Sequence, residues 1–380
     1  MKQRNLITVV TAHQLTADTI AKALGANEKH EGYYLGNSYA VTWTNGSVIE
    51  ATFKPDESFV LSTTMDPRLV YAHNFKFAMR DYDQLLGYKK TEQDKRQLAT
   101  IKELWKMSHT VVNAMSPDIE GDIDFLNLYY FLAVPVTVRR AWLPILTKGE
   151  IIKGVREGVK DAAKYEEWLS KEIYNIVVSH TEEYMPKPTP VMVEVPVSTA
   201  AEEVKELAFI GIDQANDGAV TITNEAIYRY TAKPTLHNLP QLLIDAAVQL
   251  DFGHEKTIRT ALTLYSKKLI SYPLVKQNGI PFEVWKMMLH NREVLRHNTR
   301  WGKTVRNGGL SKRHNFEGYE NEHYGFGIVT TGLHPTDLTR DEERLYNLIV
   351  KRVLDAFRPA RKHGRKKRNR RFQRKSVKTA

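Results

Sequence analysis

The sequence contains no cysteine among its 380 residues. This absence excludes disulfide bonds and thiolate metal sites, and it fits a reducing compartment. No apolar run approaches the length of a membrane span, and polar sequence follows the first ten residues too soon for a secretory signal. We therefore expect a cytoplasmic protein outside the membrane, long enough for two or three modest domains with cores of their own.

Acidic residues are absent from the final segment, Arg358–Ala380, which holds twelve lysines and arginines. The preceding 357 residues hold 43 basic and 44 acidic residues, so the formal net charge of +11 belongs to this tail. Such a segment cannot bury itself, and we expect it to be disordered when free. We interpret it as a salt-sensitive attraction to nucleic-acid phosphates, and a non-specific solubility or ribosome-attracting tail is the alternative. Its central cations are Arg365, Lys366, Lys367 and Arg368.

The first part of the chain alternates between strand-like and helix-like patterns. Leu6–Val10 predicts a buried strand, and Thr16–Leu24 predicts a helix that ends at a glycine. Tyr33–Glu50 predicts short strands separated by the turn dipeptides Gly36-Asn37 and Asn45-Gly46. The pattern continues with a helix, a buried strand and two further helices over Gln97–Met107, Thr110–Ala114, Phe125–Leu132 and Lys148–Val159. This alternation predicts an α/β domain with a mainly parallel sheet.

The later part of the chain is less regular. A helix predicted over Lys164–His180 leads into a stretch interrupted by prolines and then into the β-rich segment Ala208–Tyr230. The section Asn298–Asn321 is rich in Trp, Arg, Gly and Asn and predicts a loop. The last predicted element is a helix over Thr339–Phe357, which begins with a capping box formed by Thr339 and Glu342.

A tyrosine follows an amphipathic helix within Lys256–Pro273. The helix has one apolar stripe, made by Ile258, Leu262, Tyr265 and Leu269. Pro273 disfavours helical backbone at Tyr272, so we expect this tyrosine to be extended at the end of a short strand, beside positive charge. A phenol there could attack a phosphodiester and conserve the bond energy in a tyrosyl-phosphate. The alternative is a packing tyrosine with its hydroxyl at the surface.

Acidic side chains follow the strand predicted at Thr110–Ala114. Asp118, Glu120 and Asp122 alternate along the chain, with Asp124 next in the series. Carboxylates are the hard oxygen ligands that Mg²⁺ prefers, so these residues are a candidate metal site. A solvated acidic turn after a strand is the alternative.

Basic residues recur with one aromatic between Asn291 and His314. Such a surface can follow the phosphates of a single strand and stack a base, whereas a solvated basic face is the alternative. The candidate DNA-binding residues here are Arg292, Arg296, Arg300, Trp301 and Arg306, and Lys267 and Lys276 flank the tyrosine.

Several stretches resemble type IA DNA topoisomerases, and topoisomerase III especially, in the same order as in that family. LYSKKLISYP resembles the run that carries the family's active-site tyrosine. GYYLGNSYAVTWTNGSVIE resembles an early family stretch, and QLATIKELWKMSHTVVNAMSPDIEGDIDFLNLYYFL resembles the segment with the acidic Toprim motif. RRAWLPILTKGEIIKGVREG and GIVTTGLHPTDLTRDEERLYNLIVKRVLDAF resemble later family runs. Ordered matches from Leu6 to Phe357 are more specific than any single motif.

The resemblance implies a fold and a domain order. It implies an α/β, Toprim-like Rossmannoid domain over residues 1–145, followed by mainly helical type IA topoisomerase domains with a small β-rich arch segment. The remaining parts are a helical segment of the DNA-binding core at 146–185, the arch or linker at 186–236, the tyrosine-bearing helical domain at 237–357 and the basic tail at 358–380.

The resemblance also implies a chemistry. Tyr272 corresponds to the nucleophile that forms a transient 5′-phosphotyrosyl link with single-stranded DNA. Asp118, Glu120 and Asp122 keep the register of the Mg²⁺-binding carboxylates. Lys268 and Lys276 are the nearest cations in sequence, and His323 corresponds to a histidine that the family places near the tyrosine. The implied outcome is cleavage and religation of DNA, with relaxation or decatenation.

Four positions depart from the family pattern. Ala12 and Ser116 stand where the family has a glutamate and an aspartate, and Ile119 and Leu274 stand where it has arginines. These departures favour a second hypothesis, a catalytically inactive DNA-binding module that kept the fold. A third hypothesis is a nicking or relaxase-like transesterase that uses Tyr272 without strand passage.

Overall fold

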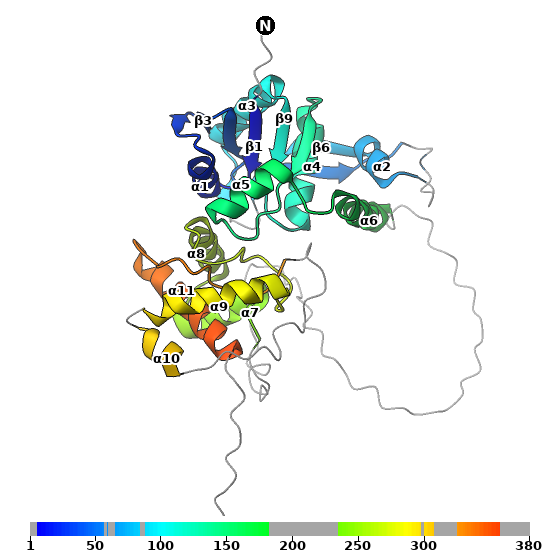
Figure 1. Ribbon diagram of the computed structural model, residues 1–380. Helices are drawn as coiled ribbons and strands as arrows, with labels where there is room; N and C mark the ends of the chain where they lie inside the picture. The colour runs from blue at the N-terminus through cyan, green and yellow to red at the C-terminus, as the bar shows by residue number, and fades with distance from the viewer. Residues whose placement is uncertain are drawn as a thin grey trace, which may run out of the picture.

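A computed structural model of the chain describes residues 6–56, 59, 65–83, 88–181, 235–297, 300–307 and 325–357. These residues form an α/β half, which ends at residue 181, and a helical half, which begins at residue 235 (Figure 1). The predicted arch segment up to residue 234 and the basic tail from residue 358 lie outside the described residues, as does His323. No helix in the described ranges is long and apolar enough to cross a membrane.

The α/β half is built on a six-stranded sheet in the order β10-β9-β1-β4-β3-β2. Four neighbouring strands are parallel, and two antiparallel strands extend the sheet at one edge. The parallel strands are β10 (Thr137–Arg140), β9 (Thr110–Asn113), β1 (Ile7–Thr11) and β4 (Tyr39–Trp43), and the antiparallel ones are β3 (Tyr33–Gly36) and β2 (Glu28–His30). The mainly parallel α/β sheet predicted from the sequence is confirmed, and the carboxyl ends of its four parallel strands lie at one edge.

Helices cover both faces of this sheet. Val9, Val41 and Val112 point to the face covered by α1 (Gln14–Leu24) and α5 (Lys148–Glu157). The alternate residues Val10 and Val111 point to the other face, where they pack against α3 (Glu92–Met107) and α4 (Ile119–Leu132). This alternation follows from the two-residue period of a strand, and it explains why these strands read as continuous apolar runs.

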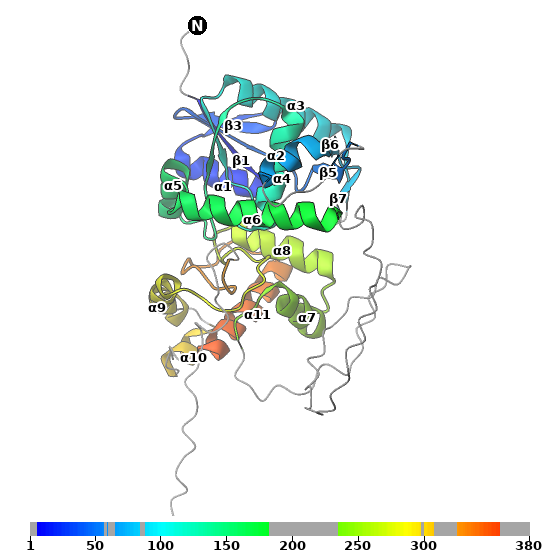
Figure 2. The ribbon, with the colours of Figure 1, turned by 90° about the vertical axis from the view of Figure 1, so that its right-hand side faces the viewer.

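A third apolar cluster lies beside the sheet. It joins the two-stranded sheet of β5 (Ile49–Phe53) and β6 (Phe75–Met79) to the helices α2 (Pro67–Asn74) and α6 (Ala162–Thr181). The short strands β7 (Tyr82–Asp83) and β8 (Tyr88–Lys89) form a separate pair. In Figure 2, α6 runs along the side of the α/β half that faces the helical half.

The helical half contains α7 (Leu239–Leu250), α8 (His254–Ser266), α9 (Phe282–Arg296), α10 (Gly302–Asn307) and α11 (Arg340–Ala356). The apolar stripe predicted for α8 is buried, and α8 packs against α7, α11 and α1. The capping box predicted at the start of α11 is present, because Thr339 and Glu342 exchange side chain to backbone hydrogen bonds. α8 therefore connects the two halves.

Three expectations about local structure are wrong. α4 begins at Ile119 rather than Phe125, because Asp118 caps it by accepting a hydrogen bond from the Gly121 N–H at 2.8 Å. The acidic stretch is therefore the first turn of a helix rather than a solvated turn. The strand expected before Pro273 is reduced to one β-bridge, between Ile270 and Thr330. Part of the loop predicted over 298–321 forms α10.

The two halves meet along a seam formed by α8 and the segment that follows it. Thr19 donates a hydrogen bond to the carbonyl of Ser266 at 2.7 Å, and the Thr16 and Ser266 hydroxyls lie 3.1 Å apart. Further along, the backbone N–H of Tyr272 donates to the carbonyl of Pro144 at 2.9 Å. The seam therefore brings Tyr272 to the carboxyl edge of the sheet.

A buried histidine in the helical half predicts a pH-dependent stability. His237 is fully buried, its Nε2 lies 2.8 Å from Asp245, and its Nδ1 has no hydrogen-bond partner among the described residues. Burial lowers the pKa of His237, and this effect outweighs the opposing bond to Asp245. The folded state therefore favours neutral His237, so its stabilising contribution is present above the ordinary histidine pKa of about 6.5 and is lost at lower pH.

We expect His237→Gln to reduce the free energy of unfolding most at pH 7.5, with the difference from wild type shrinking towards pH 5. Urea denaturation of both proteins across this range measures the difference, which isolates His237 from other titrating groups. A difference that stays constant with pH, or grows towards pH 5, contradicts the assignment.

Candidate functional site

The seam brings the predicted nucleophile and one predicted carboxylate together. The Tyr272 side chain is only 3% exposed. Its hydroxyl lies near enough to the Asp118 carboxyl and the Ser116 side chain for both to influence its pKa. Tyr272 follows α8, whereas Ser116 and Asp118 follow β9 in the other half. The side chain is therefore buried in the apolar core rather than at the surface, and whether Tyr272 is a nucleophile or a packing residue stays a prediction.

The loop after β9 is held tightly against the start of α4. A Cβ atom at Gly121 would lie 2.2 Å from the Ser116 carbonyl oxygen and 2.7 Å from its backbone nitrogen, so only glycine allows this approach. The Asn113 side chain accepts a hydrogen bond from the N–H of Met115 at 3.0 Å. These contacts, with the cap formed by Asp118, fix where Ser116 and Asp118 meet Tyr272.

A buried ion pair lies beneath this loop. Arg140, the last residue of β10, places its Nε 2.7 Å from Asp122, and both side chains are almost fully buried. The Arg140 guanidinium also donates to the carbonyls of Met115 at 3.1 Å and Ser116 at 2.5 Å, and it lies 4.7 Å from the centre of the Trp142 ring. Arg140 therefore ties the loop to the carboxyl end of β10 by charge-assisted hydrogen bonds.

The three predicted metal ligands do not converge on one point. The charge of Asp122 is compensated by Arg140, and Asp118 caps α4. Glu120 is 65% exposed, and Lys276 lies 3.6 Å from it. No group of three His, Cys, Asp or Glu side chains that could hold a metal ion occurs in the described ranges. The donor set as placed does not fit a Mg²⁺ site shared by Asp118, Glu120 and Asp122, and the reason is that a buried arginine takes up the third carboxylate.

The two groups that meet at the seam have displaced pKa values. Burial raises the pKa of Asp118 to about 7. Burial also raises the pKa of Tyr272 well above its usual value of 10, and the adjacent charge of Asp118 adds to this effect. Near neutral pH the phenol therefore keeps its proton, while the carboxyl is close to its own midpoint and is able to accept one.

A second tyrosine packs against the first. The rings of Tyr265 and Tyr272 lie 5.4 Å apart in a T-shaped arrangement, and the Tyr265 hydroxyl donates to the carbonyl of Leu143 at 2.5 Å. Tyr265 was predicted only as part of the apolar stripe and Ser116 only as a departure from the family pattern, and Arg140 was not predicted as a site residue. One feature of the sequence could have indicated Arg140: two arginines end a strand-like pattern shortly before Trp142.

The lysines predicted beside Tyr272 have different environments. Lys276 lies next to Glu120. Lys267 donates to Glu342 and to the Asp337 carbonyl, both at 2.9 Å, and so stabilises the start of α11. Lys268 has a left-handed backbone conformation in the turn after α8. The structure therefore brings only Lys276, of these three, beside a predicted carboxylate.

The basic block is partly used for packing. Trp301 donates to the Asn347 side chain at 2.8 Å and packs against the main core, so its ring joins α10 to α11. Arg292 donates to the Val305 carbonyl at 2.9 Å, and Arg300 lies over the Trp301 ring. Arg296 pairs with Glu293 at 3.2 Å.

Arg306 lies in α10, whereas His323, Arg365, Lys366, Lys367 and Arg368 lie outside the described residues. DNA binding by the block and the tail stays a prediction.

Comparisons with known proteins agree on one family. The family model described as DNA topoisomerase matches residues 162–379. DNA topoisomerase 3 of Staphylococcus aureus strain NCTC 8325 / PS 47 is 22% identical over 399 residues, which cover 90% of this chain and 54% of the relative. DNA topoisomerase 1 of Pyrococcus horikoshii is 30% identical over 127 residues, 33% of this chain and 18% of the relative.

A solved structure is also similar. Full-length topoisomerase I from Thermotoga maritima aligns with a TM-score of 0.48 and 15% identity, covering 92% of this chain and 61% of that one. The chain spans about half the length of the Staphylococcus aureus relative.

The close approach at Gly121 predicts an unequal effect of two glycine substitutions. Gly121→Ala forces a backbone shift at Ser116 and should reduce the free energy of unfolding by about 1–3 kcal/mol. Gly149→Ala, in the first turn of α5, meets no described atom within 4 Å and should be neutral or stabilising by up to about 1 kcal/mol. Urea denaturation of the two variants compares them directly. Equal effects would show that the loop is not held against α4.

The buried ion pair predicts a large cost for losing one partner. Arg140→Met leaves Asp122 buried without its cation and should lower the free energy of unfolding by about 3–5 kcal/mol. The double variant Arg140→Met/Asp122→Leu should recover much of this loss, because no uncompensated charge remains. Chemical denaturation measures both proteins. A cost below about 1 kcal/mol for Arg140→Met would contradict the assignment of a buried pair.

Proposed function

This chain belongs to the DNA topoisomerase family as a divergent type IA relative, and from that premise we propose that it binds single-stranded DNA and cleaves and rejoins it through Tyr272. The observation that carries the proposal is the Tyr272 hydroxyl, buried against the Asp118 carboxyl at the seam. A nucleophile in contact with a base contributed by another segment is the arrangement that nucleophilic catalysis requires.

The proposed step is a transesterification. The phenolic oxygen of Tyr272 attacks the phosphorus of a phosphodiester, and the phenolic proton passes to the Asp118 carboxylate. The bond from phosphorus to the 3′ oxygen breaks, this oxygen takes up a proton, and a 5′-phosphotyrosyl link forms. Attack by the 3′ hydroxyl reverses each transfer and restores the strand. A pKa of about 7 makes Asp118 a suitable base near neutral pH.

Positive charge for the phosphate is available from this chain's own residues. Lys276 is 77% exposed beside Glu120, so its ammonium is able to move to a phosphate. Arg140 is buried beneath the loop that carries Asp118, and its positive charge lowers the pKa of Asp118, which opposes the effect of burial. Asp118, Glu120 and Asp122 do not converge on one point, so the proposed step uses only the chain's own groups.

DNA reaches this hydroxyl only if the seam opens, since Tyr272 is 3% exposed. Opening breaks the hydrogen bonds from Thr19 to Ser266 and from Tyr272 to Pro144. The same movement separates Tyr272 from Asp118, so the strand has to enter before the nucleophile and base meet again around it. Cleavage is therefore expected only in the closed arrangement.

A second candidate function is DNA binding without cleavage. The observation that favours it is the burial of Tyr272, which raises the phenol's pKa in a site where Leu274 stands in place of the family's arginine. The fold alone could then present a basic surface to DNA.

Covalent trapping separates the two functions. The full chain is mixed with a 3′-labelled single-stranded oligonucleotide, with Mg²⁺ or with a chelator, and denatured before electrophoresis. We expect label on the wild-type protein, none on Tyr272→Phe, and retained label on Tyr265→Phe, which removes the neighbouring phenol. Asp118→Asn should slow adduct formation at least about 100-fold, and the wild-type rate should rise as the pH passes about 7.

Each alternative has its own outcome. An adduct that persists in Tyr272→Phe assigns the nucleophile to another residue. Salt-sensitive binding of the oligonucleotide with no adduct from the wild-type protein supports the inactive DNA-binding module instead.

A further inference from the structure

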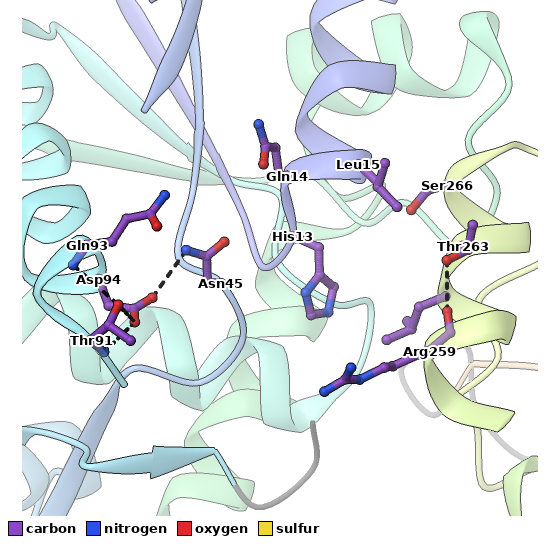
Figure 3. A pocket seen from close by; sticks show the side chains of 11 residues that line it. His13, Gln14, Leu15, Asn45, Thr91, Gln93, Asp94, Arg259, Thr263 and Ser266 are labelled. Carbon is purple, nitrogen blue, oxygen red and sulfur yellow. Dashed lines mark hydrogen bonds between the residues drawn. The ribbon is translucent and has the colours of Figure 1, made fainter. Parts of the chain in front are cut away.

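Tyr272 ends a short segment, residues 269–272, that follows α8. The start of this segment is fixed at the seam, because Ser266 at the end of α8 faces the start of α1 (Figure 3) and accepts a hydrogen bond from Thr19. Further along, the segment runs antiparallel to residues 329–331, which precede α11. The position of the tyrosine therefore depends on how firmly these two segments are held together.

A short antiparallel ladder joins the two segments. The N–H of Ser271 donates to the carbonyl of Val329 at 2.9 Å, and the N–H of Val329 donates to the Ser271 hydroxyl at 3.0 Å. On the other side of the bridge, the N–H of Thr331 donates to the carbonyl of Leu269 at 3.1 Å. Because an isolated two-stranded pairing of this kind is at best marginally stable, the ladder depends on support from its surroundings.

Asn291 of α9 supplies such support from behind the ladder. It is 1% exposed, and its side-chain nitrogen donates to the carbonyl of Thr330 at 2.5 Å. Thr330 lies opposite Ile270 in the β-bridge, so its own carbonyl points away from the neighbouring segment. Thr330 is buried as well, so Asn291 satisfies a carbonyl that water does not reach.

Close packing fixes the Asn291 side chain in this role. A Cβ atom on Gly332, where φ is +79°, would lie 2.2 Å from the Asn291 Oδ1 and 3.2 Å from its Cα. This buried Oδ1 accepts no hydrogen bond from the described residues, which is unfavourable. Exchanging the two ends of the amide would place this oxygen against the Thr330 carbonyl oxygen. The contribution of Asn291 is therefore its donation to Thr330.

We propose that Asn291 is a positioning residue for the reaction at Tyr272, and that it acts through Thr330 and the ladder without touching the reacting groups. The inference rests on the proposed function of Tyr272 as a nucleophile. Asn291 holds residues 329–331, these residues hold Ser271, and the tyrosine is the next residue. Because a displacement of about 1 Å at a reacting group can cost about 100-fold in rate, loss of this anchor should slow cleavage and leave the affinity for DNA unchanged.

The first test removes one of two similar buried asparagines from the full chain. Asn291→Leu removes the anchor, whereas Asn127→Leu removes an asparagine of α4 that is 3% exposed and donates to the Ile49 carbonyl at 3.3 Å. Trapping with a saturating 3′-labelled single-stranded oligonucleotide gives the rate of adduct formation, and fluorescence anisotropy with the same strand gives Kd. We expect Asn291→Leu to form the adduct about 10–100-fold more slowly than wild type, with Kd changed less than about 2-fold, whereas Asn127→Leu keeps the wild-type rate within about 2-fold.

A glycine pair tests the same contact from the opposite side and does not depend on whether Asn291→Leu folds. Gly332→Ala displaces the Asn291 side chain. Gly25→Ala, at the end of α1, is its matched control, because φ is +76° there and the new Cβ would lie 2.2 Å from the Asn37 Nδ2. Gly332→Ala should slow adduct formation as Asn291→Leu does, whereas Gly25→Ala should not.

Two results would overturn the inference. In the first, Asn291→Leu and Gly332→Ala form the adduct as fast as their control variants. In the second, Kd rises as steeply as the rate falls, which would show that the substitutions disturb binding and the fold rather than the position of the tyrosine.

An absence of any adduct from the wild-type protein would refute the proposed cleavage and leave the anchor to be judged by hydrogen exchange. Faster exchange of the Ser271 and Val329 amides in Asn291→Leu than in Asn127→Leu supports the anchor. Equal exchange in the two variants contradicts it.

Discussion

The ion pair between Arg140 and Asp122 is the constraint on which the site depends. It is buried at the carboxyl ends of β9 and β10, and neither charge could remain there without the other. The same guanidinium donates to the carbonyls of Met115 and Ser116, which belong to the loop that contacts Tyr272. A single buried cation thus compensates Asp122 and sets the path of the loop. The position of Asp118 follows, because that loop ends where Asp118 caps α4.

This use of Asp122 also changes the chemistry available at the site. A carboxylate that pairs with an internal arginine is not available to share a divalent cation with Asp118 and Glu120. Burial raises the pKa of Asp118 to about 7, which under the proposed function suits this carboxyl to accept the Tyr272 proton. Ser116 stands where the family has an aspartate, and Leu274 stands where it has an arginine. The site therefore carries fewer negative and fewer positive charges than the family pattern.

The seam couples the geometry of the site to the relation between the two halves. Tyr272 and Tyr265 come from the helical half, yet both donate hydrogen bonds to backbone carbonyls next to β10, at Pro144 and Leu143. The closed seam therefore places Tyr272 near Asp118 and Ser116, which follow β9 in the other half. Under the proposed function, opening the seam exposes Tyr272 and separates it from Asp118 at the same time.

Local patterns in the sequence were sufficient to predict the α/β class of the first half, the apolar stripe of α8 and the capping box of α11, whereas Tyr272 was selected through the resemblance to type IA topoisomerases. Each of these local patterns depends on residues within a few positions of one another, so periodicity and turn chemistry predict them. The early start of α4, the pairing of Arg140 with Asp122, the burial of Tyr272 and the packing of Trp301 were decided by tertiary structure. These features join residues from different elements or from different halves, and no local pattern specifies which buried cation a carboxylate meets. The sequence by itself therefore determined the main elements and the candidate site residues, and only the folded chain decided which of these residues meet, because burial and charge pairing depend on contacts across the seam and the sheet.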